Sequence, residues 1–197
     1  NLSSSKLVNQ LSVAFYPEEY IGTKEKHIIV SVGRLINIKG YDIAVRTAKL
    51  LREQGVQFVW YIVGEGEERN NLQNDIKNFR LEKEFILLGL KENPYPYILN
   101  AEILVQPSRF EGKSVVLDEA KILRKPIVVT NYNSVEDQIE DGKTGLIADM
   151  TPESLEKKIE LILAEKSLKG KIEENLRTGK NGAIEQVDEY CEILMEK

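Results

Sequence analysis

The chain has 197 residues, of which 42% are hydrophobic and 30% charged, and its formal net charge is −5. This composition is typical of an ordinary globular protein with enough apolar side chains to form a core. The acidic balance argues against a general affinity for nucleic acid. We therefore expect any anionic ligand to be held by a local cluster of positive charge.

The single cysteine, Cys191, excludes an internal disulfide and suits a reducing compartment, so we expect a cytoplasmic location. No apolar run in the sequence approaches the length of a membrane span, and no secretory signal is visible. Because the chain begins at Asn1 rather than Met, we expect it to be a fragment of a longer protein.

Apolar runs and amphipathic segments alternate along most of the chain. Six runs predict buried strands, at residues 27–32, 58–63, 85–90, 103–105, 126–130 and 145–148. Helical patterns are found at residues 41–51, 67–80, around 98, from about 112 to 123, 135–139 and 152–163. This alternation predicts an α/β fold, a doubly wound, Rossmann-like and mostly parallel sheet of about six strands with helices on both faces.

The two ends of the chain break this rhythm. Residues 1–26 are weakly patterned and are expected to be a linker and lead-in loop, and residues 27–165 form the expected domain. Residues 166–197 are expected to be a helical tail that is polar as far as residue 181. An apolar stripe follows, at Ile184, Val187, Tyr190, Cys191 and Leu194. Such a stripe needs a partner surface, either the core of this domain or a domain missing from the chain.

Ligands of open parallel sheets bind beyond the carboxyl ends of the strands. Two predicted loops lie at this edge of the sheet, residues 33–40 and 107–113. In the first, Gly33 would let the backbone approach a ligand closely, and Arg34 and Lys39 suit a diphosphate. Taken alone, two such cations are more often solvent-exposed residues of a turn.

The second loop leads into a helix that we expect to begin near Gly112. The backbone amides of Gly112, Lys113, Ser114 and Val115 would open this helix, and helix N-termini favour phosphate. Glu111, just before them, either contacts the ligand or only complements the helix dipole.

Glu119, further along the same helix, shares its face with apolar neighbours. These neighbours are Val115, Val116, Ile122 and Leu123. A carboxylate in an apolar stripe is costly to bury without a hydrogen bond, so we predict that Glu119 faces a ligand. Asp118, one residue earlier, is predicted to be an ordinary solvated acid.

Other features favour structural roles. Gly64 and Gly66 follow a strand, but Arg69 stands where a dinucleotide fingerprint needs its third glycine, so we expect a tight turn. The only histidine, His27, begins a strand, which leaves no plausible Ser-His-acid set. No Cys/His cluster or paired-aspartate motif is present, so we expect no zinc site and no bound divalent metal.

In their order, these motifs resemble the C-terminal, donor-binding domain of a group 1 (family 4) glycosyltransferase of GT-B architecture. The resemblance runs from about residue 27 to residue 162. Residues 33–40 match the family's G-R-L-x-x-x-K-G segment, and Glu111 and Glu119 stand eight residues apart, as in its E-x7-E signature. The remaining matches are Ser108, Gly112, Ala120, residues 126–128, Asp141, Gly142 and Gly145.

The resemblance implies a retaining, metal-independent transfer of sugar from a nucleoside-diphosphate sugar, with this chain as the donor-binding half. Arg34 and Lys39 would bind the diphosphate. Glu119 would hold the ribose hydroxyls and Glu111 the donor sugar. The amides of residues 112–115 would complete the pocket, and the loop after Leu90 would lie near the base. Alone, the chain would bind donor without transferring it.

The resemblance also implies a partner, an N-terminal acceptor-binding domain that is missing from this chain. An acceptor on a lipid carrier would bring the protein to the inner face of the membrane through that domain. The family's common E-G-F-G loop is replaced here by Glu111-Gly112-Lys113-Ser114, which makes Lys113 a candidate phosphate or sugar contact. This loop and residues 93–95 resemble the branch that builds bacterial surface polysaccharide and capsule.

Three other functions remain open at the level of the sequence. A non-catalytic nucleotide-binding domain and a nucleotide-sugar epimerase share the architecture. A nicotinamide-dependent dehydrogenase is disfavoured by Arg69 and by the lack of an acid at a clear ribose position. Binding of a nucleotide-sugar donor separates the first of these from a transferase.

Overall fold

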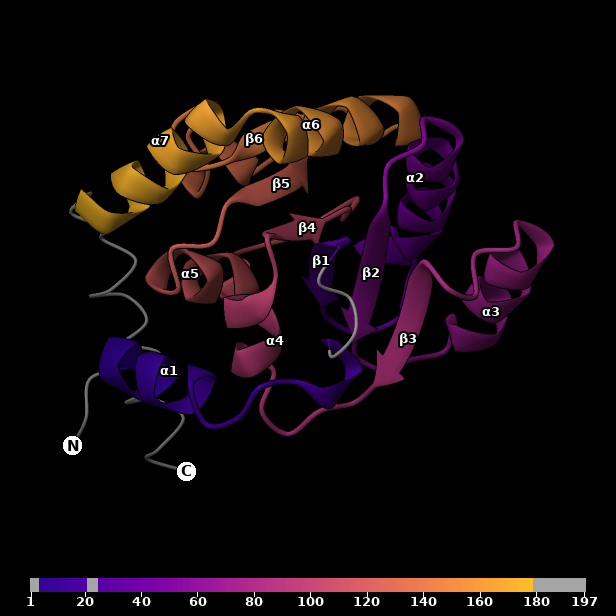
Figure 1. The fold of residues 1–197 in the computed structure, drawn as a ribbon, viewed down its shortest axis with the longest axis horizontal. Helices are drawn as coiled ribbons and strands as arrows, with labels where there is room; N and C mark the ends of the chain where they lie inside the picture. Colours follow the sequence, from indigo (N-terminus) through magenta and orange to yellow (C-terminus); the bar gives the residue numbers. More distant parts are fainter. Residues whose placement is uncertain (1–3, 21–24, 179–197) are drawn as a thin grey trace.

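The computed structural model describes residues 4–20 and 25–178. Its centre is an all-parallel sheet of six strands in the order β3-β2-β1-β4-β5-β6 (Figure 1). The strands are β1 His27–Val32, β2 Phe58–Val63, β3 Phe85–Gly89, β4 Ile103–Gln106, β5 Ile127–Thr130 and β6 Leu146–Ala148. Each predicted strand is present, with ends that differ by at most one residue, because strands covered on both faces read as continuous apolar runs.

Helices cover both faces of this sheet. They are α1 Ser4–Ser12, α2 Tyr41–Glu53, α3 Arg69–Asn78, α4 Tyr95–Asn100, α5 Val115–Ile122, α6 Pro152–Ala164 and α7 Lys166–Thr178, with 3-10 turns η1 Glu18–Tyr20, η2 Asn37–Lys39 and η3 Val135–Asp137. Helices α2, α3, α6 and α7 pack on one face, and α1, α4 and α5 on the other (Figure 1). The predicted α/β fold is confirmed, and the helix expected at 135–139 is only a 3-10 turn.

The strand order reverses direction at β1. This strand pairs with β2 on one side and with β4 on the other, so the loops that follow β1 and β4 diverge toward opposite faces. In open α/β sheets such a switch point forms the crevice in which ligands bind. The loops 33–40 and 107–113 are the ones that leave the sheet there.

The N-terminal segment was expected to be a linker, and the structure shows a helix and a packed turn instead. Tyr20 is buried, stacks on Tyr61 with ring centroids 4.7 Å apart, and donates a hydrogen bond to the carbonyl of Tyr97 at 3.0 Å. Asn93 donates a side-chain hydrogen bond to the carbonyl of Leu11 at 2.9 Å. These partners lie more than 40 residues away along the chain, which is why local patterning did not reveal them.

The C-terminal segment was expected to be a helical tail, polar as far as residue 181; α7 is indeed a helix, but it belongs to the core. Ile172 and Leu176 are buried in the same cluster as α6. Lys169 forms an ion pair with Glu102 at 2.9 Å, and Glu102 also contacts His27 at 2.9 Å. Burial alone would raise the pKa of Glu102, but hydrogen bonds from Lys169 and His27 more than offset it and hold that pKa below its usual value. The stripe at residues 184–194 lies outside the described residues.

We predict that Gly40→Ala strongly destabilises the protein. Gly40 has φ 67°, and a Cβ built there would lie 1.9 Å from the carbonyl oxygen of Pro107. A left-handed backbone costs an alanine about 1–3 kcal/mol, and the overlap with the backbone adds to this cost. The measurement is the free energy of unfolding in urea.

The matched control is Gly170→Ala in α7, where a Cβ meets nothing within 4 Å. Because alanine favours a helix interior over glycine, this change should stabilise the protein by about 0.5–1 kcal/mol. Equal effects of the two substitutions would contradict the close approach at Gly40.

Candidate functional site

The loops after β1 and β4 are locked together at the carboxyl edge of the sheet. Besides the close approach of Gly40 to Pro107, the amide of Arg109 donates to the carbonyl of Ile38 at 2.8 Å. The guanidinium of Arg109 donates two hydrogen bonds to the carboxylate of Asp42, both of 2.7 Å. Such a bidentate pair is directional, so the two loops have one relative position.

This arrangement brings Lys39, from the loop after β1, into contact with Glu111, from the loop after β4. Lys39 Nζ donates to Glu111 Oε1 at 2.7 Å. Both side chains are largely buried, with 22% of Lys39 and 10% of Glu111 exposed. Water screens a largely buried ion pair less than a surface pair. This contact therefore stabilises the relative position of the two loops.

Two residues that the sequence reading missed also hold Glu111. Ser108 Oγ donates to Glu111 Oε1 at 2.6 Å, and Gln106 Nε2 donates to the same oxygen at 3.1 Å. Ser108 was noted only as a family match. The sequence contains one signal for Gln106. It is a polar residue that directly ends an apolar strand, at the edge of the sheet where ligands bind.

The start of α5 differs from the prediction. The helix begins at Val115 with Ser114 as its N-cap residue, and the amide of Ser114 donates to Gln138 Oε1 at 2.8 Å. The amides of residues 112–115 therefore do not form one continuous row at a helix start. Ser134 Oγ lies within hydrogen-bond distance of the carbonyls of Glu111 (2.9 Å) and Gly112 (2.8 Å), so the loop before α5 is held from the η3 side.

Asp118 was predicted to be solvated, and this prediction is wrong. Only 2% of Asp118 is exposed, and its carboxylate lies 3.3 Å from Lys121 Nζ and 3.4 Å from Lys113 Nζ. Burial lowers the pKa of Lys121, and the charge of Asp118 partly offsets this effect. Lys113, a candidate donor contact, is thus placed beside Asp118 in this structure.

Glu119 has a different environment from its neighbour. It is half-buried, and Tyr95 donates a hydrogen bond to Glu119 Oε1 at 2.9 Å. Burial, with a smaller contribution from the charge of Asp118, raises the pKa of Glu119 to about 7, although the hydrogen bond from Tyr95 acts in the opposite direction. A carboxyl group with a strongly raised pKa in a crevice is a candidate for ligand binding.

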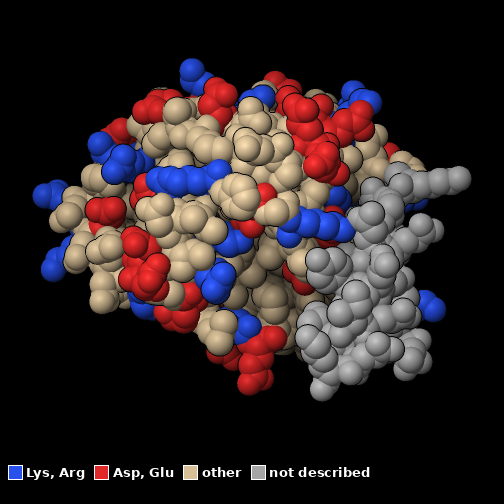
Figure 2. Space-filling model, turned by 180° about the vertical axis from the view of Figure 1, so that it is seen from behind, with Lys and Arg blue, Asp and Glu red and all other residues tan. Residues whose placement is uncertain are grey.

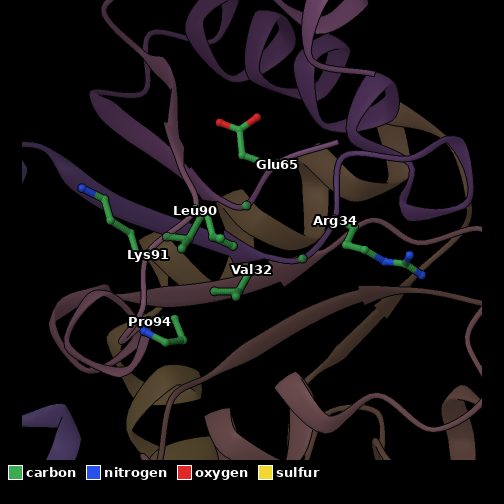
Figure 3. A pocket seen from close by; sticks show the side chains of 9 residues that line it. Val32, Arg34, Glu65, Leu90, Lys91 and Pro94 are labelled. Carbon is green, nitrogen blue, oxygen red and sulfur yellow. The ribbon is translucent and has the colours of Figure 1, made fainter. Parts of the chain in front are cut away.

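Arg34 projects from the loop after β1 beside a pocket of about 260 Å³. Val32, Leu90 and Pro94 lie together in this pocket, while the Arg34 side chain points away from them (Figure 3). Arg34 is exposed, and its side chain has no hydrogen bond or ion pair to any residue that the structure describes. It is therefore available to an anion at the mouth of the pocket.

The glycines of the turn after β2 allow the backbone of neighbouring loops to pack closely at this pocket. A Cβ at Gly64 would lie 1.9 Å from the carbonyl oxygen of Gly33, and one at Gly66 would lie 2.3 Å from that of Leu35. The amide of Gly64 donates to the carbonyl of Gly89 at 2.9 Å. These contacts agree with a tight turn, and they pack the loops after β1, β2 and β3 directly against one another.

Charges of both signs are mixed on the surface. On the face shown in Figure 2, Lys and Arg side chains are interspersed with Asp and Glu.

Within residues 4–20 and 25–178, no group of three or more His, Cys, Asp or Glu side chains is arranged to hold a metal ion. In the same part of the chain, no helix is long and apolar enough to cross a membrane.

We predict opposite effects for two neighbouring substitutions in α5. Asp118→Asn should destabilise the protein by about 3–5 kcal/mol, because it leaves Lys121 buried without its counter-charge. Glu119→Gln should stabilise the ligand-free protein at pH 8.5 and have little effect at pH 5. Urea unfolding at both pH values measures these changes.

The sign for Glu119 follows from its raised pKa. The folded protein holds this proton more tightly than the unfolded chain, so the contribution to stability is fully present below the ordinary carboxyl pKa and is lost as the pH rises through about 7. Glutamine imitates the protonated form at every pH. A stabilisation of equal size at pH 5 and pH 8.5 would contradict this assignment.

Comparison with known proteins agrees with this fold. Residues 15–182 match the model of the family described as "Glycosyl transferases group 1". The chain is 29% identical over 161 residues to an alpha-D-kanosaminyltransferase from Streptomyces kanamyceticus, covering 80% of this chain and 42% of that protein. It is 25% identical over 155 residues to the capsular polysaccharide biosynthesis glycosyltransferase CapM from Staphylococcus aureus, covering 78% of this chain and 41% of the relative.

Solved structures share the fold at lower identity. The Anabaena protein HepE in complex with UDP-glucose has a TM-score of 0.78 and 17% identity, over 100% of this chain and 54% of that one. A C-terminal domain of a glycosyl transferase group 1 family protein from Francisella tularensis has a TM-score of 0.70 and 22% identity, over 86% of this chain and 96% of that one. The chain thus spans about half the length or less of the curated relatives it matches. It belongs to the group 1 glycosyltransferase family.

Proposed function

We propose that this chain is the donor-binding half of a retaining glycosyltransferase that takes a sugar from a nucleoside-diphosphate sugar. The observation that carries this proposal is the juxtaposition of Lys39 with Glu111 at the switch point of the sheet, next to the exposed Arg34 and an apolar pocket. A cation pair suits a diphosphate, an apolar pocket suits a base, and a carboxylate suits sugar hydroxyls.

Each part of the donor has a matching group. Arg34 and Lys39 bind the diphosphate, and the pocket between Val32, Leu90 and Pro94 takes the base. Glu119 accepts hydrogen bonds from the ribose hydroxyls, and donor binding favours its ionised form because an ionised carboxylate only accepts. Glu111 faces the donor sugar. Two structural neighbours support a nucleotide sugar as the ligand, since HepE was solved with UDP-glucose and TarM of S. aureus with UDP.

Catalysis in this proposal is electrostatic. As the bond from the sugar to the diphosphate breaks, negative charge grows on the departing phosphate and positive charge on the sugar ring. Arg34 and Lys39 stabilise the first and the carboxylate of Glu111 the second, from positions set before the reaction begins. The cations take the neutralising role, so the proposal includes no divalent metal.

The acceptor is bound by a second, N-terminal domain, and the product belongs to a bacterial surface polysaccharide. The name of CapM supports the second part. A relative from Campylobacter jejuni, 33% identical over 137 residues, carries diphospho-undecaprenol in its name, which supports a lipid-linked acceptor. The likeness to the isolated C-terminal domain from F. tularensis supports the placement of this chain in a longer protein.

We predict that Arg34→Ala weakens binding of the nucleoside diphosphate about 10- to 100-fold and leaves binding of the bare nucleoside unchanged. One charge-assisted hydrogen bond contributes roughly 1.5–3 kcal/mol, which sets this range. Isothermal calorimetry with UDP, GDP and ADP and with their nucleosides measures it. Arg34 is a cleaner probe than Lys39, because Lys39→Ala also releases Glu111.

Arg46→Ala is the matched control, since Arg46 is an exposed arginine on α2 and lines no part of the pocket. It should leave both affinities unchanged. Equal losses for nucleoside and diphosphate in Arg34→Ala would contradict contact with the phosphates, and failure of the chain to bind any of the three diphosphates would contradict the proposed function.

We further predict that binding of the diphosphate needs no divalent metal. Adding EDTA to the chain should leave the calorimetric affinity for the diphosphate unchanged. Loss of binding with EDTA and its recovery with magnesium would show that a metal ion, rather than Arg34 and Lys39 alone, neutralises the phosphates.

A further inference from the structure

The carboxylate of Glu111 is held on one side only. Lys39 Nζ, Ser108 Oγ and Gln106 Nε2 donate to Oε1 at 2.7, 2.6 and 3.1 Å. Among the described residues, every hydrogen bond to this carboxylate ends on that oxygen. A carboxylate offers about four lone-pair sites over its two oxygens, so Oε1 is saturated and the capacity that remains is on Oε2.

Gln106 differs from the other two donors because its amide is fixed at both ends. Only 6% of Gln106 is exposed. Its Oε1 accepts a hydrogen bond from Ser114 Oγ at 2.7 Å, and an amide oxygen only accepts, so the Nε2 group must face Glu111. The backbone of Ser114 is held in turn, by two hydrogen bonds with the Gln138 side chain of 2.8 and 2.9 Å.

The other two donors are less able to orient the carboxylate. Lys39 is a flexible cation, and in the proposed function it also binds the diphosphate, so its contact with Glu111 is shared once the donor arrives. The Ser108 hydroxyl rotates to suit its acceptor and so allows a range of carboxylate orientations. The planar, doubly anchored amide of Gln106 selects one orientation in both the free and the bound state.

We propose that Gln106 is a positioning residue, which holds Oε1 of Glu111 so that Oε2 faces the donor sugar. This inference rests on the proposed function and deepens it. It predicts that Gln106 contributes to recognition of the sugar and not of the diphosphate, because the phosphates contact Arg34 and Lys39 instead. A general loosening of the domain would weaken both.

The experiment compares Kd values for a diphosphate and its sugar conjugate by calorimetry. The pairs are UDP with UDP-glucose, UDP with UDP-N-acetylglucosamine, and GDP with GDP-mannose. Of these pairs, the experiment uses the one in which the unsubstituted chain binds the sugar conjugate more tightly than the diphosphate. The ratio of the two Kd values measures the contribution of the sugar.

Gln106→Met keeps the length of the side chain and removes both amide hydrogen bonds. It should reduce this ratio about tenfold while leaving the Kd of the diphosphate unchanged, since a hydrogen bond to a charged group is worth about that factor. In a chain that already carries Glu111→Gln, adding Gln106→Met should change the ratio no further, because the two residues act on one contact.

Gln138→Met is the matched comparison, with the same amide-to-thioether change in the same network but no contact with Glu111. Because it acts on Gln106 only through the backbone of Ser114, it should reduce the ratio by less than Gln106→Met does. If Gln106→Met does not fold, Ser114→Ala gives a second test. It frees the amide of Gln106 to flip, keeps the backbone contacts to Gln138, and should reduce the ratio by a smaller factor.

Several outcomes would overturn the inference. One is an unchanged ratio in Gln106→Met, or in Ser114→Ala if only that variant folds. Another is a loss of the ratio in Gln138→Met as large as that in Gln106→Met. The third is the absence of any contribution of the sugar to binding by the unsubstituted chain. In each of these cases the diphosphate still binds, so the proposed function survives. Failure to bind every diphosphate would instead overturn the proposed function itself.

Discussion

The candidate site depends on the contact between two loops that leave the sheet on either side of its switch point. Gly40 lies against the carbonyl of Pro107, and the bidentate pair of Arg109 with Asp42 spans the same junction. Only a residue without a Cβ allows the first contact, and only a planar fork donor makes the second in this form. Because of them, Lys39 and Glu111 meet at 2.7 Å although 72 residues separate them.

Near this junction, the neighbouring acids Asp118 and Glu119 of α5 have different surroundings. Asp118 is buried with Lys121 and Lys113 beside it, so its charge is compensated within the protein. Glu119 has one hydrogen bond from Tyr95 and no ion pair among the described residues, and burial raises its pKa to about 7. A carboxyl group left in that state costs stability, and such a cost is common where a ligand completes the interaction.

The ends of the described chain complete the domain rather than leave it. Helix α1 and the turn after it cover the face of the sheet occupied by α4, and α7 packs beside α6 on the other face (Figure 1). The ion pair of Lys169 with Glu102, which also contacts His27, ties α7 to the amino edge of the sheet, far from the crevice. The site therefore rests on a sheet with a buried core on each of its faces, while the curated relatives are about twice as long or longer.

The sequence by itself determined the six strands, the α/β class and the two loops of the crevice. Strands buried on both faces are encoded by unbroken apolar runs, and the loops that contain Gly33, Arg34, Lys39 and Glu111 begin where two of those runs end. Only the tertiary structure decided that Asp118 is buried, because one group that covers it, the Gln138 side chain at 3.4 Å, comes from a segment 20 residues away that the periodicity of α5 does not reveal. It also decided the contacts of Gln106, Gln138 and the terminal helices, since no local periodicity encodes them.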